Sequence, residues 1–460
     1  MKKKSLKGMA GLVLAMTIFL TACGAEQTGA DAESSAADAV TESGVADYPT
    51  VEELLAECTY VNAEMYERAT AYPAGNLSRI IAAMEKAEAG EKVTIGVIGG
   101  SITQGSSASS QNTCYASLLK QWWVDTFPQA DIEFVNAGIG GTTSYLGVHR
   151  VQEDLLSYEP DFVVVEFSVN DSNTNFYKKS YENLVRRIMC EEYNPAVLLL
   201  FMTMDNGTSA QGNDSLIGFQ YEIPMISYGN AILDEIRGGN FTWKDISPDN
   251  IHPNDRGHAI VAEILDVYLT DIYNRKDELA TEVTAFDKDV LTKEVYMDAA
   301  ILNAEDIEPI QWGSFTVADI NDRFHGNWYT ETGEESLIFE VEAANIGIMY
   351  QEMVNGNGGE YEIIIDGTAL ATINADFPNG WGNYSETVEV YVSDEKAKLF
   401  FQISVTNFRH QTVIIYLLQY RRQVNVQFNT FAHDSFFLKS KEPSPPSNRF
   451  LCPIKTFIWL

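Results

Sequence analysis

The chain has 460 residues, which is longer than one ordinary domain and suggests two or three folded units. Its composition, with 45% hydrophobic and 11% aromatic residues, lies in the globular range and excludes a chain that is disordered throughout. The formal net charge of -34 repels phosphate backbones and argues against nucleic acid as a partner.

Residues 1–23 have the pattern of a bacterial lipoprotein signal peptide. Four lysines among the first seven residues precede an apolar run from Met9 to Leu20, which is too short to span a bilayer stably. The run ends in Leu-Thr-Ala-Cys23, which is similar to a lipobox, where Cys23 would be acylated after cleavage. The alternative is an ordinary secretory signal with a chance cysteine. We therefore expect an extracytoplasmic protein, anchored to the bacterial cell membrane by lipid on Cys23.

Residues 24–48 are small, polar and acidic, with almost no large apolar side chains. Such a segment cannot bury enough surface to fold, so we predict a disordered linker that holds the rest of the chain away from the membrane.

Residues 49–275 alternate short apolar runs with amphipathic stretches, the pattern of strands and crossover helices in a parallel sheet. The predicted strands are 93–98, 132–136, 162–167 and 197–202. The predicted helices are 76–89, 115–127, 146–157, 181–190, 226–236 and 254–273. This alternation predicts an α/β domain.

Residues 285–420 change to alternating β patterns, typical of an all-β sandwich. The predicted strands are 337–343, 361–365, 387–392 and 399–405, and Asp366-Gly367 indicates a hairpin. Aromatic residues in or near its turns would suit a carbohydrate-binding role by stacking on sugar rings, the alternative being core and edge packing. They are Trp312, Trp328, Tyr329, Trp381 and Tyr384.

Residues 421–460 are basic and proline-interrupted in a chain otherwise dominated by acids. We interpret this atypical tail as a frameshifted or misassembled end, the alternative being a natural basic tail.

A serine follows the first predicted strand of the α/β domain. Gly99-Gly100-Ser101 comes directly after the carboxyl end of that strand, where α/β sheets bind their ligands. The glycines allow a sharp turn that exposes the Ser101 hydroxyl. Because similar turns cap helices and bind phosphate, this pattern alone does not establish catalysis.

Two further polar loops follow the next two strands, one with Gly140 and Gly141 and the other with Asn170. The three strands would bring these groups and Ser101 to one rim, as an oxyanion hole requires. The alternative for Asn170 is an Asx turn that closes its loop.

Asp249 stands three residues before His252, ahead of the last predicted helix. An aspartate in that position can accept the Nδ1 hydrogen bond and leave Nε2 free to take a proton from serine. The chain has only six histidines, so this pair is a specific pattern. His258, inside the predicted helix, is expected to pack or cap.

Together these residues resemble the four sequence blocks of the SGNH/GDSL hydrolase superfamily, in the same order. The resemblance implies a flavodoxin-like three-layer α/β/α domain with a parallel sheet. It also implies that Ser101 is the nucleophile, His252 the general base and Asp249 its orienting partner. The Ser101 and Gly141 amides and the Asn170 side chain would form the oxyanion hole, with Gly140 as an alternative to Gly141.

Two positions depart from the superfamily pattern. Gly100 replaces the aspartate that usually precedes the serine, and Ser168 replaces the glycine that usually stands two residues before the asparagine. Neither removes a reacting atom, but both change how the nucleophile turn is braced.

The resemblance implies ester hydrolysis through an acyl-enzyme, which requires no metal or organic cofactor. The cysteines lack metal-binding spacing, and we expect Cys114 and Cys190 to be small core residues. Exported esterases of this superfamily commonly deacylate carbohydrates, so we predict O-deacetylation of an acylated polysaccharide outside the cytoplasm. The alternative enzyme is a lipase, lysophospholipase or thioesterase. From another class, the alternative is a non-catalytic glycan-binding surface lipoprotein.

Overall fold

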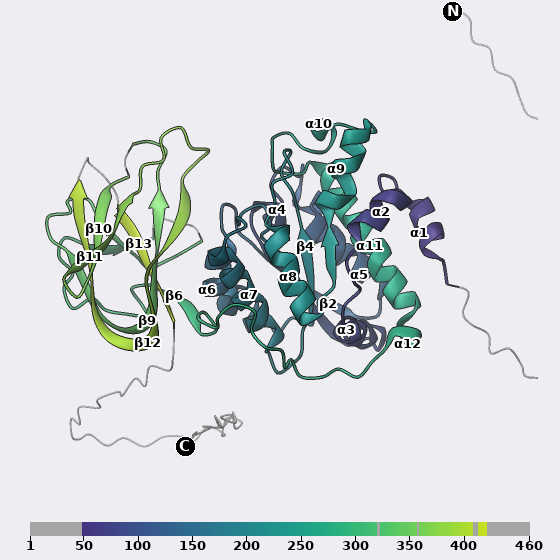
Figure 1. Ribbon diagram of the computed structural model, residues 1–460, viewed down its shortest axis with the longest axis horizontal. Helices are drawn as coiled ribbons and strands as arrows, with labels where there is room; N and C mark the ends of the chain where they lie inside the picture. The colour runs from purple at the N-terminus through teal and green to yellow at the C-terminus, as the bar shows by residue number, and fades with distance from the viewer. Residues whose placement is uncertain (1–47, 320–322, 357, 408–412, 421–460) are drawn as a thin grey trace, which may run out of the picture. The chain divides into compact units, whose positions relative to one another are not determined.

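The computed structural model describes residues 48–319, 323–356, 358–407 and 413–420, in which an α/β domain is followed by an antiparallel β domain (Figure 1). The predicted signal peptide with Cys23, the linker up to residue 47 and the tail 421–460 lie outside the described residues. Judged by their contacts, the two domains belong to one compact unit, which begins at Pro49.

The α/β domain is built on a sheet of five parallel strands. They are β1 (Lys92–Gly99), β2 (Asp131–Gly138), β3 (Phe162–Glu166), β4 (Ala196–Phe201) and β5 (Met225–Ser227). Their order is β2-β1-β3-β4-β5, which is the order of flavodoxin-like folds. The fold class expected for this domain is therefore confirmed.

Helices cover both faces of the sheet because successive strand residues point to opposite sides. Phe162 and Val164 pack into one core with helices α3, α5, α9 and α11, while Val163 and Val165 pack into a second core with α6, α7 and α8. Figure 1 shows these two helical layers on either side of the strands. The helices that form these layers are α3 (Ser78–Glu88), α5 (Tyr115–Thr126), α6 (Ser144–Asp154), α7 (Asn175–Met189), α8 (Gln211–Tyr221), α9 (Tyr228–Gly238) and α11 (Asp255–Asn274).

Shorter elements complete the domain. They are α1 (Val51–Glu57), α2 (Ala63–Ala69), α4 (Ser101–Gln104), α10 (Trp243–Ile246), α12 (Lys276–Leu279) and the 3-10 turns Gln111–Thr113 and Leu156–Tyr158. The sequence prediction missed α8 and β5. Strand β5 has only three residues, and the predicted helix 226–236 overlapped it.

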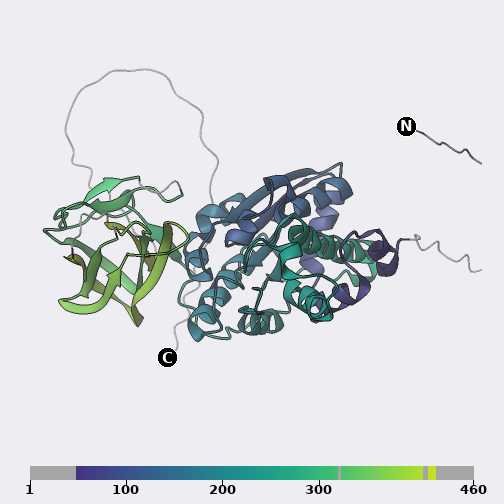
Figure 2. The same cartoon turned by 90° about the horizontal axis from the view of Figure 1, so that it is seen from above.

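The second domain is an antiparallel β domain with its own core (Figure 2). Its strands are β6 (Ala299–Leu302), β7 (Thr316–Ala318), β8 (Asn327–Thr330), β9 (Leu337–Glu352), β10 (Glu360–Ile365), β11 (Thr368–Asn374), β12 (Tyr384–Asn407) and β13 (Val413–Tyr420). The order is β11-β10-β12-β9-β13-β8-β7, and β6 pairs with β13. The prediction of an all-β domain after the α/β domain is confirmed.

Two details of this domain bear on the sequence prediction. The hairpin at Asp366-Gly367 is present, with φ angles of 48° and 78° that suit a two-residue turn between β10 and β11. The two strands predicted at 387–392 and 399–405 are instead parts of one long strand, β12, whose register with β9 shifts between Val392 and Ala397. A register shift lets a long strand bend without ending.

Two of the cysteine predictions can be compared with the structure. Cys114 is buried as predicted, whereas the prediction for Cys190 is wrong, because this residue directly follows the end of α7 and is exposed. Among the described residues, no helix combines the length and apolar character needed to cross a membrane.

Candidate active site

The predicted site residues meet at the carboxyl edge of the parallel sheet. Ser101 is the first residue of α4, directly after β1. The loops after β2 and β3 carry Gly141 and Asn170 to the same edge. Asp249 and His252 come from the segment between α10 and α11. Three neighbouring strands and one loop therefore assemble the groups that lie far apart in the sequence.

Ser101, His252 and Asp249 form a continuous hydrogen-bonded chain. Ser101 Oγ lies 2.9 Å from His252 Nε2, and His252 Nδ1 lies 2.8 Å from Asp249 Oδ2. This is the arrangement in which a histidine can take the serine proton while the aspartate fixes its tautomer.

The Asp249 carboxylate also holds the loop that carries the histidine. Its Oδ1 accepts hydrogen bonds from the Ile251 amide at 2.8 Å and the His252 amide at 2.7 Å. Partial burial raises the pKa of Asp249, but the hydrogen bonds from His252 and Ile251 outweigh it and leave the pKa below its usual value. Ser247 braces the same loop, because its hydroxyl lies 2.6 Å from the His252 carbonyl and 2.9 Å from the Asp249 carbonyl and shares its one proton between them.

The two glycines after β2 have different environments. The Gly140 amide donates to Gln104 Oε1 at 2.7 Å, so it is already engaged within the protein. Gly141 has a φ of +74°, which favours glycine, and its amide has no hydrogen-bond partner within the described residues. Of the two amides, that of Gly141 is the one left able to donate to an oxyanion, as the sequence predicts.

The Asn170 side chain packs against the turn that carries the nucleophile. A Cβ atom placed on Gly100 would lie 2.1 Å from Asn170 Oδ1. Glycine at position 100 therefore makes room for Asn170 beside Ser101. The neighbouring Asp171 accepts a hydrogen bond from the Ser144 amide at 2.9 Å, which ties the Asn170 loop to the segment after Gly141.

A buried carboxylate contacts the turn that carries Ser101. Glu166 is fully buried, and Thr103 donates to its Oε2 at 3.0 Å. Burial raises the pKa of Glu166 to about 7, and the Asp171 charge adds to this, while the Thr103 hydroxyl and the Gly100 and Ser168 amides oppose it. Burial likewise raises the pKa of Asp171 to about 7.

The sequence prediction missed three polar residues around the nucleophile turn: Gln104, Arg150 and Glu166. The Arg150 guanidinium is buried and donates to the Ala137 and Gly99 carbonyls, where β2 and β1 end. Of these three residues, only Glu166 could have been singled out from the sequence, because it is the one charged residue in the otherwise apolar strand β3. His258 is buried and accepts the Tyr115 amide, in agreement with its predicted packing role.

Five aromatic residues were candidates for sugar stacking, and the structure separates them. Trp328 is buried in the β-domain core, and Trp312 and Tyr329 pack partly into cores. Trp381 is 69% exposed, and its ring centroid lies 4.9 Å from that of Tyr384, with the two ring planes tilted by 32°. A Cβ atom placed on Gly141 would lie 3.1 Å from the Trp381 ring, so the exposed indole borders Gly141.

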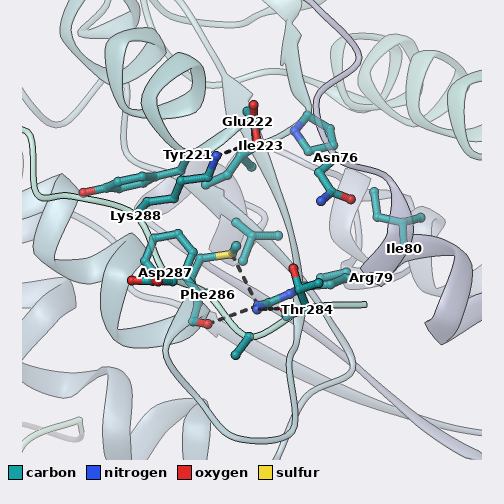
Figure 3. Close-up of a pocket in the computed structure, with 15 residues that line it drawn as sticks. Asn76, Arg79, Ile80, Tyr221, Glu222, Ile223, Thr284, Phe286, Asp287 and Lys288 are labelled. Atoms are coloured by element: carbon teal, nitrogen blue, oxygen red, sulfur yellow. Dashed lines mark hydrogen bonds and ion pairs between the residues drawn. The ribbon is translucent and has the colours of Figure 1, made fainter. Parts of the chain in front are cut away.

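A separate cavity of about 460 Å³ lies at the opposite edge of the sheet, near the amino ends of β4 and β5 (Figure 3). In it, Arg79 donates to the Thr284 carbonyl at 3.2 Å, and Lys288 pairs with Glu222 at 2.7 Å. These contacts fasten the segment that follows α12. The cavity contains neither Ser101 nor His252. Among the residues that the structure describes, no cluster of three or more histidine, cysteine or acidic side chains could hold a metal ion.

Residues 97–260 match the GDSL-like lipase/acylhydrolase family. The solved structure of a two-domain esterase active on acetylated mannans is 34% identical, with a TM-score of 0.72, and the match covers 78% of this chain and 99% of the other. The same enzyme co-crystallized with mannopentaose gives a TM-score of 0.71. A thioesterase 1/protease 1/lysophospholipase L1 of Escherichia coli K12 is 23% identical over 189 residues, which are 39% of this chain and 85% of that protein.

Proposed function

We propose that this chain, which belongs to the GDSL-like lipase/acylhydrolase family and is a serine ester hydrolase, removes acetyl groups from a polysaccharide outside the cytoplasm. The observation that carries the substrate class is the similarity to an esterase active on acetylated mannans, which extends over both domains. The extracytoplasmic location rests on the signal-peptide pattern of residues 1–23.

In the proposed mechanism, Ser101 Oγ attacks the carbonyl carbon of an acetyl ester. His252 Nε2, at 2.9 Å, takes the serine proton and gives it to the departing sugar hydroxyl. Water then attacks the acetyl-serine while His252 takes a proton from it; the bond between the acyl carbon and Ser101 Oγ breaks, His252 returns the proton to Oγ, and acetate leaves. Asp249 stabilises the histidine while it is protonated.

The negative oxygen of each tetrahedral intermediate needs donors that are already in place. The Ser101 amide, the Gly141 amide and the Asn170 side-chain amide serve this purpose. Because Gly140 already binds Gln104, the loop is held without using the Gly141 amide. The donors therefore do not have to reorganise when the charge develops.

Trp381 and Tyr384 support a carbohydrate substrate. An exposed indole beside the oxyanion glycine can stack on the sugar ring that carries the acetyl group. A Trp381→Ala variant should lower kcat/KM on acetylated polysaccharide about 2- to 10-fold. Its activity on p-nitrophenyl acetate, which has no sugar ring, should stay near that of the wild type.

The test of the proposed function is a panel of substrates. Acetate release from acetylated mannan and xylan is measured beside hydrolysis of p-nitrophenyl esters from acetyl to long acyl chains, with Ser101→Ala as the blank. A preference for acetyl esters together with acetate release supports the proposal. A preference for long acyl chains, or for acyl thioesters, without acetate release would favour the alternative acylhydrolase that the Escherichia coli relative suggests.

A further inference from the structure

Glu166 is an unusual residue for its place in the fold. It is the last residue of β3, whose other residues are apolar, and its side chain is fully buried. A carboxylate in such a place is costly unless hydrogen bonds satisfy it. The groups around it belong mainly to the turn that carries Ser101: the Thr103 hydroxyl donates to Oε2 at 3.0 Å and the Gly100 amide faces the carboxylate, while Oε1 has no hydrogen-bond partner within the described structure.

The hydrogen bonds around Glu166 have a defined direction. When Glu166 is ionised, the Thr103 hydroxyl gives its one proton to Glu166, and the Tyr115 hydroxyl at 2.7 Å then donates to Thr103. The resulting chain connects α5, α4 and β3. Thr103 and Gly100 stand on either side of Ser101 in the sequence, so Glu166 holds the nucleophile turn at two points.

The superfamily usually has an aspartate at the position of Gly100, so the turn in this chain lacks a carboxylate of its own. Asn170 Oδ1 occupies the space that a Cβ atom at position 100 would need, with only 2.1 Å between them. An aspartate therefore does not fit before Ser101 while Asn170 keeps its place. The carboxylate that contacts the turn comes instead from β3, where the buried Glu166 accepts the Thr103 hydroxyl at 3.0 Å.

We propose that Glu166 is the positioning residue of the nucleophile, and that its carboxylate fixes Gly100 and Thr103 so that Ser101 stays in line with His252. The inference rests on the proposed role of Ser101. Glu166 does not touch the substrate, and it acts by holding the Ser101 hydroxyl 2.9 Å from His252 Nε2.

Glu166→Gln tests the carboxylate with little change in shape. Glutamine has one acceptor oxygen with two lone pairs, but the Gly100 amide, the Ser168 amide and the Thr103 hydroxyl all face this group. One donor is left unpaired and the turn shifts. Because small displacements of reacting groups are costly, we expect kcat to fall about 10²-fold with KM nearly unchanged.

Three further variants separate positioning from general destabilisation. Thr103→Val keeps the shape but removes the donor, and should lower kcat about 10-fold or more, whereas Thr103→Ser keeps the hydroxyl and should restore activity. Asp214→Asn is the matched control. Asp214 is a buried carboxyl that interacts electrostatically with Asp171 and Glu166, but its side chain makes no hydrogen bond to the turn within the described structure. It should keep the wild-type kcat.

The experiment measures kcat and KM on p-nitrophenyl acetate, the rate of labelling by a fluorophosphonate, and the melting temperature of each variant. Slow labelling and low kcat in fully folded Glu166→Gln and Thr103→Val support the proposal. It is overturned if these variants melt earlier but keep wild-type kcat and labelling rate per folded molecule, or if Asp214→Asn loses as much activity. If Glu166→Gln does not fold, the comparison of Thr103→Val with Thr103→Ser decides.

Ser101→Ala distinguishes this proposal from the proposed function. An inactive Ser101→Ala beside a fully active Glu166→Gln overturns the positioning role alone. An active Ser101→Ala overturns the nucleophile assignment, and the role of Glu166 falls with it.

Discussion

Replacing Asn170 tests the oxyanion hole most sharply. Loss of one preorganised donor from such a site lowers kcat by about 10²–10³-fold, or about 2.7–4 kcal/mol of transition-state stabilisation. The effect on folding should be much smaller, because the turn at Asn170 is closed by its backbone amide, which donates to the Phe167 carbonyl at 2.9 Å. We therefore expect Asn170→Ala to lose activity with a small change in KM and in melting temperature.

Asn170→Asp is the matched variant for this test. Aspartate has the same shape, so it fills the same space against Gly100, but it cannot donate to an oxyanion and its charge would repel one. We expect its kcat on p-nitrophenyl acetate to fall at least as far as that of Asn170→Ala. For both variants, kcat is determined per active site, with the active sites counted by titration, and the melting temperature is measured alongside.

The reasoning would be refuted by a stable Asn170→Ala protein with normal kcat. It would also be refuted if both variants lost stability while kcat per folded molecule stayed unchanged, since Asn170 would then only close a turn. In either case the Ser101 and Gly141 amides would be the remaining oxyanion donors.

Three further predictions follow from the triad, the N-terminus and the buried acids. Asp249→Asn should lower kcat by about 10²–10⁴-fold in steady-state kinetics because the histidine loses the partner that fixes its tautomer, and an unchanged kcat would remove Asp249 from the triad. Cys23→Ser should move the protein from the membrane fraction to the soluble fraction on immunoblots, since a short apolar run cannot anchor it alone, and unchanged membrane retention would contradict the lipoprotein prediction. Burial raises the pKa of Glu166 and Asp171 to about 7 and raises that of Asp214, so between about pH 4 and 7 the folded protein keeps protons that the unfolded chain has released. These acids therefore contribute stability that is lost as the pH rises through that range, so the melting temperature of Asp214→Asn should decline less, or rise more, with pH than that of the wild type; an identical slope in that variant would count against the buried-acid explanation.

Much of the α/β domain could be predicted because its strands are buried on both faces and read as continuous apolar runs. Strands β1 to β4 differ from the predicted ranges by one or two residues at their ends. Strand β5 was missed because three residues, Met225 to Ser227, carry no periodic pattern before α9 begins. Helix α8 was missed because both of its faces are partly apolar, with Phe219 exposed and Ile217 buried.

In the site, too, contacts between residues close in the sequence could be predicted, whereas contacts between residues far apart in the sequence could not. The Asp249 and His252 pair is local in sequence, and the turn that joins them could be predicted from their spacing. The role of Gly100 could not, because the atoms that require glycine there belong to Asn170, seventy positions along the chain. Trp381 lies near Gly141 only through the arrangement of two domains, which no pattern within either segment encodes.

The most direct test of the central claim is to identify the residue that carries the acyl group during turnover. The protein is mixed with an acetylated mannan, quenched in acid within one turnover, digested and analysed by mass spectrometry. We expect one added acetyl group on the peptide that contains Ser101, and none in the Ser101→Ala variant. An acetyl group on a different residue, or acetate release by Ser101→Ala at the wild-type rate, would contradict it.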